Sequence, residues 1–377
     1  MVYSAELIEG TTVNTLWLEH KLCAKFAESI KIDNVSPLGS DAVGYMSVIR
    51  KLHLSGSPKI PATVILKTPA PEGGMEAVEK AGGKTEANNE RANLVQEAFH
   101  DTECETLAVL NEGEHNIKVP KLYYVGKSDT QTPCIIMEEI VDCTVQPLIP
   151  GFNEAQLYIL VDQIVELQHW SLKNAEWRKP MSAAQEELGM SCTPMLLAMC
   201  STFFTKHKAV FGDLGEKMME NTLKSREHYT HWFRTVYETD ERPVVLVHGD
   251  MWTANFLWHG NALGAIVDWQ LAHAGNVVED IMRLLTTCTS SAIRRRMTTS
   301  LLNHYYNLLS SKNGGKLSFS REQLEEEYKF YLPAGCVWTT FAVAFWENSI
   351  LNTEGKVKEA LDRLKCFLED TAELLNW

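Results

Sequence analysis

Two short polar segments in the second half of the chain combine residue types suited to phosphoryl transfer. The segment 248–250 reads His-Gly-Asp, and Asn255 follows Asp250 five positions later. Asp268 comes after the apolar run at 265–267. Transfer of a phosphoryl group to a hydroxyl needs a carboxylate that accepts the proton and hard oxygen ligands for Mg²⁺. Asp250 is therefore the candidate base, and Asn255 and Asp268 are the candidate metal ligands.

The significance of these residues lies in their combination. A lone His-Gly-Asp tripeptide is usually a turn. Here Asp250 and Asn255 occupy one loop between two strand-like runs, and Asp268 ends a third such run. A hairpin would bring Asp268 back beside the loop, so the three side chains are expected to converge. Asp280, further along, is expected to cap a helix or brace this loop.

The elements around these segments predict an α+β chain with a strand-rich first part and a mainly helical second part. Apolar periodicity favours strands in the first part, joined to helices at 12–30 and 95–111. The second part is expected to contain a helix capped by Asn153 and Gln156, a strand–loop–strand block and a C-terminal helix. The expected strands are 45–52, 62–67, 119–125 and 134–137, the block is 243–270, and the last helix is 356–376.

Composition limits the possible partners and compartment. The formal net charge of −14 argues against a nucleic-acid binder, which needs lysine and arginine against the phosphate backbone. Nine scattered cysteines without a C-x-x-C pair favour reduced thiols, and no apolar leader starts the chain, so a cytoplasmic protein is expected. The uncharged stretch from Tyr331 to Trp346 contains Pro333 and is too short to span a bilayer comfortably, which favours a buried helix.

These motifs resemble those of a known group of enzymes. The segment 248–250 with Asn255, and the segment 266–270 (Ile-Val-Asp-Trp-Gln), are similar to the catalytic and metal-binding loops of choline kinase-like and aminoglycoside phosphotransferase-like proteins. His273, Gly275-Asn276 and Glu279-Asp280 continue the pattern. The resemblance is greatest to the ecdysteroid-kinase-like branch, particularly the nematode-type CHK kinase-like proteins. It covers roughly residues 35–370.

The resemblance implies a two-lobed protein-kinase-like fold, with a small β-rich lobe at 1–137 and a larger, mainly helical lobe at 138–377, joined at a hinge near 138–143. It implies Asp250 as the base, and Asn255 and Asp268 as the Mg²⁺ ligands. It also assigns residues to bound ATP. These are Lys67 at the α/β-phosphates, Glu103 as its partner with Glu105 as the rival, Gly39, Gly44 and Ser47 in the segment over the phosphates, and Met137, Glu138 and Ile140 at the adenine.

The chain departs from related kinases in two ways. No G-x-G-x-x-G occurs, so the nucleotide-covering loop depends on Gly39 and Gly44 alone. No Ala-Pro-Glu motif follows Asp268, which counts against a protein substrate.

The predicted function is ATP- and Mg²⁺-dependent phosphorylation of an alcohol group on a small molecule. The alternative is a nucleotide-binding pseudokinase or scaffold, and a protein kinase is less favoured. The acceptor stays open among sterols, amino alcohols and glycosides. The acidic net charge could favour a cationic acceptor, but charge alone does not locate that field at the site. The oligomeric state cannot be inferred from the sequence.

Overall fold

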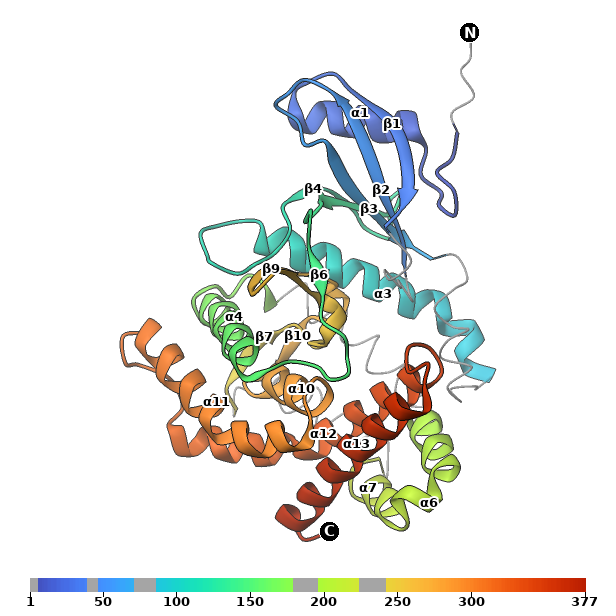
Figure 1. Ribbon diagram of the computed structural model, residues 1–377. Helices are drawn as coiled ribbons and strands as arrows, with labels where there is room; N and C mark the ends of the chain where they lie inside the picture. The colour runs from blue at the N-terminus through green and yellow to red at the C-terminus, as the bar shows by residue number, and fades with distance from the viewer. Residues whose placement is uncertain (1–5, 39–46, 71–85, 179–195, 224–241) are drawn as a thin grey trace.

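The N-terminal lobe is an antiparallel sheet in which β-branched and apolar residues alternate between two faces. The computed structural model describes residues 6–38, 47–70, 86–178, 196–223 and 242–377, without the side chains of 86–94. Within these ranges the sheet has five strands in the order β1-β2-β3-β5-β4 (Figure 1). The strands are β1 (Ile30–Pro37), β2 (Ser47–Gly56), β3 (Thr63–Pro69), β4 (Leu122–Gly126) and β5 (Cys134–Glu138).

Helix α1 (Thr15–Phe26) is shorter than the helix expected over 12–30. The side chain of Asn14 caps its start by accepting hydrogen bonds from the backbone N–H groups of Leu16 and Trp17. Ala27 ends it in the left-handed conformation, at φ 53°. Ile30, expected on the helix, instead begins β1, and its side chain is buried in the core that the sheet shares with α1. The error arose because an apolar residue at helical spacing can equally well start a strand.

The two faces of the sheet belong to different cores. Val64 and Leu66 of β3 pack with Leu18 and Leu22 of α1 on one face. Ile65, between them in sequence, points to the other face and joins the large core of the C-terminal lobe. This alternation follows from the period of two residues along a strand. It places Lys67, the next residue after Leu66, on the face that looks toward the C-terminal lobe.

Helix α3 (Glu86–Leu110) lies between the sheet and the C-terminal lobe (Figure 1). It begins earlier than the helix expected from 95. It packs against η3 (Trp269–Leu271), the 3₁₀ turn that directly follows Asp268. One side of α3 is therefore held close to the candidate metal-binding segment.

Small antiparallel sheets position the loops of the C-terminal lobe, and helices surround them (Figure 1). After β5 the chain reaches β6, which pairs with β8 and not with the N-terminal sheet. The strands are β6 (Thr144–Val145), β7 (Val244–Val247), β8 (Phe256–His259), β9 (Ala262–Ile266) and β10 (His273–Asn276). The helices are α4 (Glu154–Lys173), α6 (Lys208–Phe211), α7 (Leu214–Thr222), α10 (Glu279–Thr287), α11 (Ser291–Lys312), α12 (Arg321–Glu347) and α13 (Glu354–Leu375).

Two expectations for these helices agree with the structure. Helix α4 starts with the predicted capping box, in which Asn153 and Gln156 bond reciprocally to each other's backbone N–H. The stretch from Tyr331 to Trp346 lies inside α12, largely buried and with Pro333 within the helix. Among the described residues, no helix combines the length and apolar character needed to cross a membrane.

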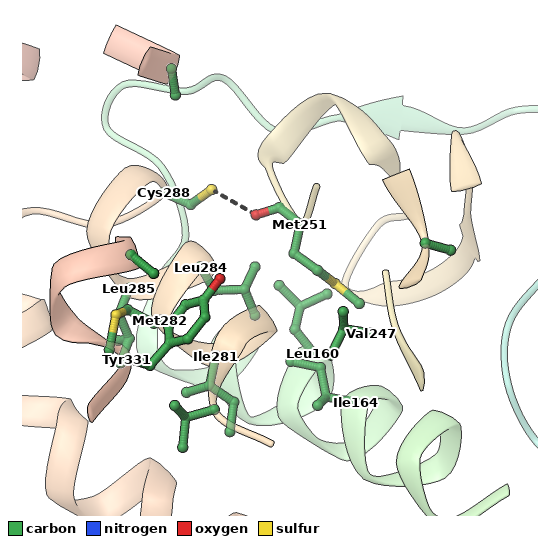
Figure 2. Packing of buried hydrophobic residues seen from close by; sticks show 14 of the residues in the cluster. Leu160, Ile164, Val247, Met251, Ile281, Met282, Leu284, Leu285, Cys288 and Tyr331 are labelled. Carbon is green, nitrogen blue, oxygen red and sulfur yellow. Dashed lines mark hydrogen bonds between the residues drawn. The ribbon is translucent and has the colours of Figure 1, made fainter. Parts of the chain in front are cut away.

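The core beneath the 248–255 loop is built from α4, β7 and α10. Figure 2 shows Leu160 and Ile164 of α4 beside Val247 and Met251, with Ile281 and Leu284 of α10 on the other side. The Cys288 thiol points to the Met251 carbonyl oxygen, 3.8 Å away. The loop thus rests on a packed apolar base, which restricts where Asp250 can lie.

Candidate functional site

The 248–255 loop begins with a turn that only glycine fits. Gly249 has φ +78°, and a Cβ atom built on it would lie 2.3 Å from the carbonyl oxygen of Leu271. The carboxylate of Asp280, on α10, accepts hydrogen bonds from the backbone N–H groups of His248 (2.9 Å) and Gly249 (3.0 Å). Asp280 therefore braces the loop.

His248 ties the loop to the segment that carries Asp268. Its Nε2 lies 3.1 Å from the carbonyl oxygen of Val267, and its Nδ1 accepts a hydrogen bond from the backbone N–H of Asp250 at 3.2 Å. The ring packs against Trp269 and is fully buried. Burial lowers the pKa of His248 to about 4, so the ring is neutral. This environment gives His248 a structural part in the loop.

Asp250 is held by one residue that sequence reasoning anticipated and by one that it missed. The amide of Asn255 donates to the Asp250 carbonyl oxygen at 2.9 Å and lies 3.4 Å from the carboxylate. Arg283, on α10, donates from Nη2 to the other carboxylate oxygen at 2.9 Å. Burial raises the pKa of Asp250, and the Arg283 charge opposes that rise. The carboxylate keeps 15% of its side chain exposed, so it can still be reached.

Asp268 follows β9 in a left-handed backbone conformation, at φ 67°. Its carboxylate lies 2.6 Å from the ammonium of Lys67, which comes from β3 in the other lobe. A backbone hydrogen bond also holds the segment of Asp268 beside Asn255, because Val267 donates its N–H to the Asn255 carbonyl oxygen at 3.0 Å. Figure 1 shows β9 (Ala262–Ile266), the strand that leads to Asp268, below α3.

Lys67 forms a second ion pair, with Glu103 of α3, at 2.5 Å. Both side chains are almost completely buried. Burial alone would lower the pKa of Lys67, but Asp268 and Glu103 outweigh it, so that the pKa is raised and the ammonium stays charged. Glu105, the rival candidate, pairs with Lys127 at 2.5 Å. Two positions along a helix turn a side chain through about 200°, so only one of the two glutamates can face Lys67.

Among the residues that it describes, the structure does not bring the remaining expected nucleotide contacts together in one place. Gly39 and Gly44 lie outside the described residues. Ser47 begins β2, and its backbone pairs with Pro69 on β3. Met137 and Glu138 end β5, where Glu138 exchanges hydrogen bonds with Lys121, and Ile140 follows. Ser47 thus lies at one end of β3, whereas Met137 and Glu138 pair with Ile65 and Val64 at its other end.

The donor set around Asn255 and Asp268 fits Mg²⁺. The Asn255 amide nitrogen is committed to Asp250, which leaves its oxygen as the atom for a metal. The Asp268 side chain is 30% exposed and supplies a carboxylate. Within the described ranges, no group of three or more His, Cys, Asp or Glu side chains could hold a metal ion. An ion here would therefore rely on these two oxygens and on phosphate or water oxygens, which is the usual pattern for Mg²⁺ with a nucleotide.

Arg283 could have been suspected from its helical spacing. It follows Asp280 by three positions on α10, so the two side chains share one helix face. Because Asp280 was expected near the loop, an arginine one turn later could reach it too. Nothing local indicates that it pairs with Asp250.

The arrangement is that of the two-lobed kinase fold used by small-molecule phosphotransferases. Choline kinase from Cryptosporidium parvum has a similar solved structure, with TM-score 0.54 and 11% identity, covering 92% of this chain and 90% of that one. The aminoglycoside phosphotransferase APH(2")-IIa in complex with gentamicin matches with TM-score 0.48 and 15% identity, covering 94% and 99%. The N-terminal sheet, the mainly helical C-terminal lobe and the likeness to the choline kinase confirm the expected fold class.

The chain belongs to the DUF1679 family, whose description is "Uncharacterized oxidoreductase dhs-27", with residues 18–376 matched. A curated relative with that name, from Caenorhabditis elegans, is 25% identical over 347 residues. The match covers 87% of this chain, which spans 41% of the length of that relative.

Proposed function

We propose that the protein is an ATP- and Mg²⁺-dependent phosphotransferase that phosphorylates an alcohol group of a small molecule. One observation supports this above all. Asp250, Asn255 and Asp268 converge from two loops, and Asp268 meets the buried Lys67–Glu103 pair from the other lobe. These residue types are those that phosphoryl transfer between bound ATP and a hydroxyl requires.

In this proposal Asp250 orients the acceptor hydroxyl and accepts its proton as the oxygen attacks the γ-phosphorus. ADP leaves when the bond between the β–γ bridging oxygen and that phosphorus breaks. Lys67, fixed by Glu103, contacts the α/β-phosphates. The hinge lies near 138–143, and Met137, Glu138 and Ile140 contact the adenine. Asn255 and Asp268 would hold Mg²⁺, and the bound ion would neutralise phosphate charge. The neutral ring of His248 and the side chain of Asp280 hold the loop in place through hydrogen bonds to its backbone.

The name of the curated relative indicates an oxidoreductase, but this does not alter the proposal. This chain matches less than half of that protein. The sequence of this chain has no G-x-G-x-x-G, the fingerprint of a dinucleotide-binding turn. A pseudokinase stays as the second candidate, because Lys67, the residue expected at the phosphates, is already paired with both Glu103 and Asp268.

The decisive experiment measures ADP release with Mg²⁺ and ATP across a panel of sterols, amino alcohols and glycosides. Asp250→Asn should lower acceptor-dependent turnover by roughly 10²–10⁴. Asp162→Asn removes the same charge from α4, where it pairs with His304, and should leave turnover unchanged. Equal turnover in wild type and Asp250→Asn would contradict the proposal. Mg²⁺-dependent ATP binding without turnover on any acceptor would favour the pseudokinase.

A further inference from the structure

Arg283 fixes a positive charge directly beside the candidate base. Its Nη2 donates to Asp250 at 2.9 Å, and its Nη1 donates to the Trp338 carbonyl oxygen at 3.0 Å. Its guanidinium carbon lies 5.6 Å from the centre of the Trp346 ring. Only 10% of the side chain is exposed. The guanidinium is therefore held by a carboxylate, a carbonyl and an aromatic ring at once.

Aromatic rings lie beside Arg283 and continue along helix α12. Trp252, two residues after Asp250, lies 5.1 Å from Trp346, with 32° between the ring planes. Helix α12 adds Phe341, whose ring centre is 5.6 Å from Trp338 and 6.3 Å from Phe345. Positions 338, 341 and 345 share one face of the helix. As whole residues, Trp252, Trp338, Phe341 and Phe345 are all half-buried.

Such a surface next to a carboxylate would ordinarily suit a cationic ligand, because ammonium groups bind to aromatic faces and to negative charge. Here the guanidinium of Arg283 already contacts both the carboxylate and an aromatic ring. It neutralises Asp250 and lies against Trp346. A second cation would meet the fixed guanidinium at close range, and like charges placed together in a shielded site select against the ligand that carries one.

We propose that the site accepts an uncharged alcohol with an apolar body, and that Arg283 is the specificity residue that rejects cationic alcohols. This inference rests on the proposed function. It also addresses whether the net charge of −14 acts at the site, since the charge fixed directly beside Asp250 is the positive one of Arg283.

The test compares two acceptors that differ only in charge, choline and its carbon isostere 3,3-dimethylbutan-1-ol. Wild type should show a kcat/KM at least about tenfold higher for the neutral alcohol. Arg283→Gln should bring the ratio close to one or below it, mainly by lowering KM for choline. Arg283→Lys keeps the charge and should keep the preference. Arg296→Gln removes an exposed arginine that pairs with Glu154 and should leave the ratio unchanged.

The outcomes separate this inference from the proposed function. A wild-type preference for choline, with turnover lost in Asp250→Asn, would overturn the inference and leave the kinase intact. An unchanged ratio in a folded Arg283→Gln variant would also overturn it. If neither alcohol is phosphorylated, ligand-observed NMR measures their binding directly. Stronger binding of the neutral alcohol, lost in Arg283→Gln, supports the inference, whereas equal, reversed or absent binding overturns it.

Discussion

At the residue scale, Gly249 sets the shape of the turn before Asp250. Gly249→Ala must adopt positive φ with a side chain and must also displace the Leu271 carbonyl oxygen, 2.3 Å from the new atom. We expect the free energy of unfolding to fall by about 3 kcal/mol. Gly260→Ala is the matched control, because its φ is +59° and no atom lies within 4 Å of the added carbon. It should cost only about 1 kcal/mol in urea unfolding. Equal losses in the two variants would contradict this account of the turn.

His273 makes the stability of the fold depend on pH. Burial alone would lower its pKa, but Glu279, 3.1 Å away, outweighs this and raises the pKa to about 9 from its ordinary 6.5. The folded state then retains a proton that the unfolded state loses. The stabilisation is complete below pH 6.5 and is lost as the pH rises through 9, and it amounts to about 3 kcal/mol.

Thermal unfolding of wild type and His273→Gln checks this expectation. Burial raises the pKa of Asp280 to about 7, so the stability that its proton contributes also falls with rising pH, mostly below about pH 8. Between about pH 8 and 9 the decline therefore comes mainly from His273. His273→Gln should remove the decline in that window. Glu279→Gln should shift the decline to lower pH. An identical decline in wild type and His273→Gln would show that another group titrates there.

At the scale of elements, helix α3 connects the lobes through Glu103. Glu103→Gln removes one carboxylate from the Lys67 pair, while Asp268 remains. The proposed function then predicts a KM for ATP raised by roughly tenfold, because Lys67 loses its orientation toward the phosphates. Glu105→Gln, on the same helix, releases only Lys127 and should leave KM unchanged. Similar KM values for both variants in steady-state assays would contradict the assignment of Glu103.

Local sequence patterns predicted the elements well where each residue's surroundings are decided by its neighbours in the chain. The apolar run Val64, Ile65 and Leu66 predicted β3, and Asn153 predicted the start of α4. Patterns failed where distant contacts decide. Ile30 joined a strand because β2 lies beside it, and Arg283 reached Asp250 because α10 packs under the loop. The convergence of Asp250, Asn255 and Asp268 could be expected because all three lie within one strand–loop–strand block.

At the scale of the whole molecule, Lys67 and Asp268 join the two lobes through an ion pair that a bound nucleotide would have to break. Phosphate oxygens would bind Lys67 in place of Asp268, and Mg²⁺ would bind Asp268 in place of Lys67. Binding at both residues adds ligand contacts between the lobes, so the folded state should be stabilised through mass action.

ATP with Mg²⁺ at about a hundred times its dissociation constant should therefore add about 2.7 kcal/mol to the free energy of unfolding, a rise of a few degrees in Tm. Differential scanning fluorimetry measures this. Removing Mg²⁺ with EDTA should abolish most of the rise, and Asp268→Asn should do the same in the presence of Mg²⁺. Asp162→Asn, away from the site on α4, should respond as wild type does. A full rise with EDTA present, or in Asp268→Asn, would mean that the nucleotide binds without this pair of residues. It would also mean that the bridge between Lys67 and Asp268 serves the fold alone.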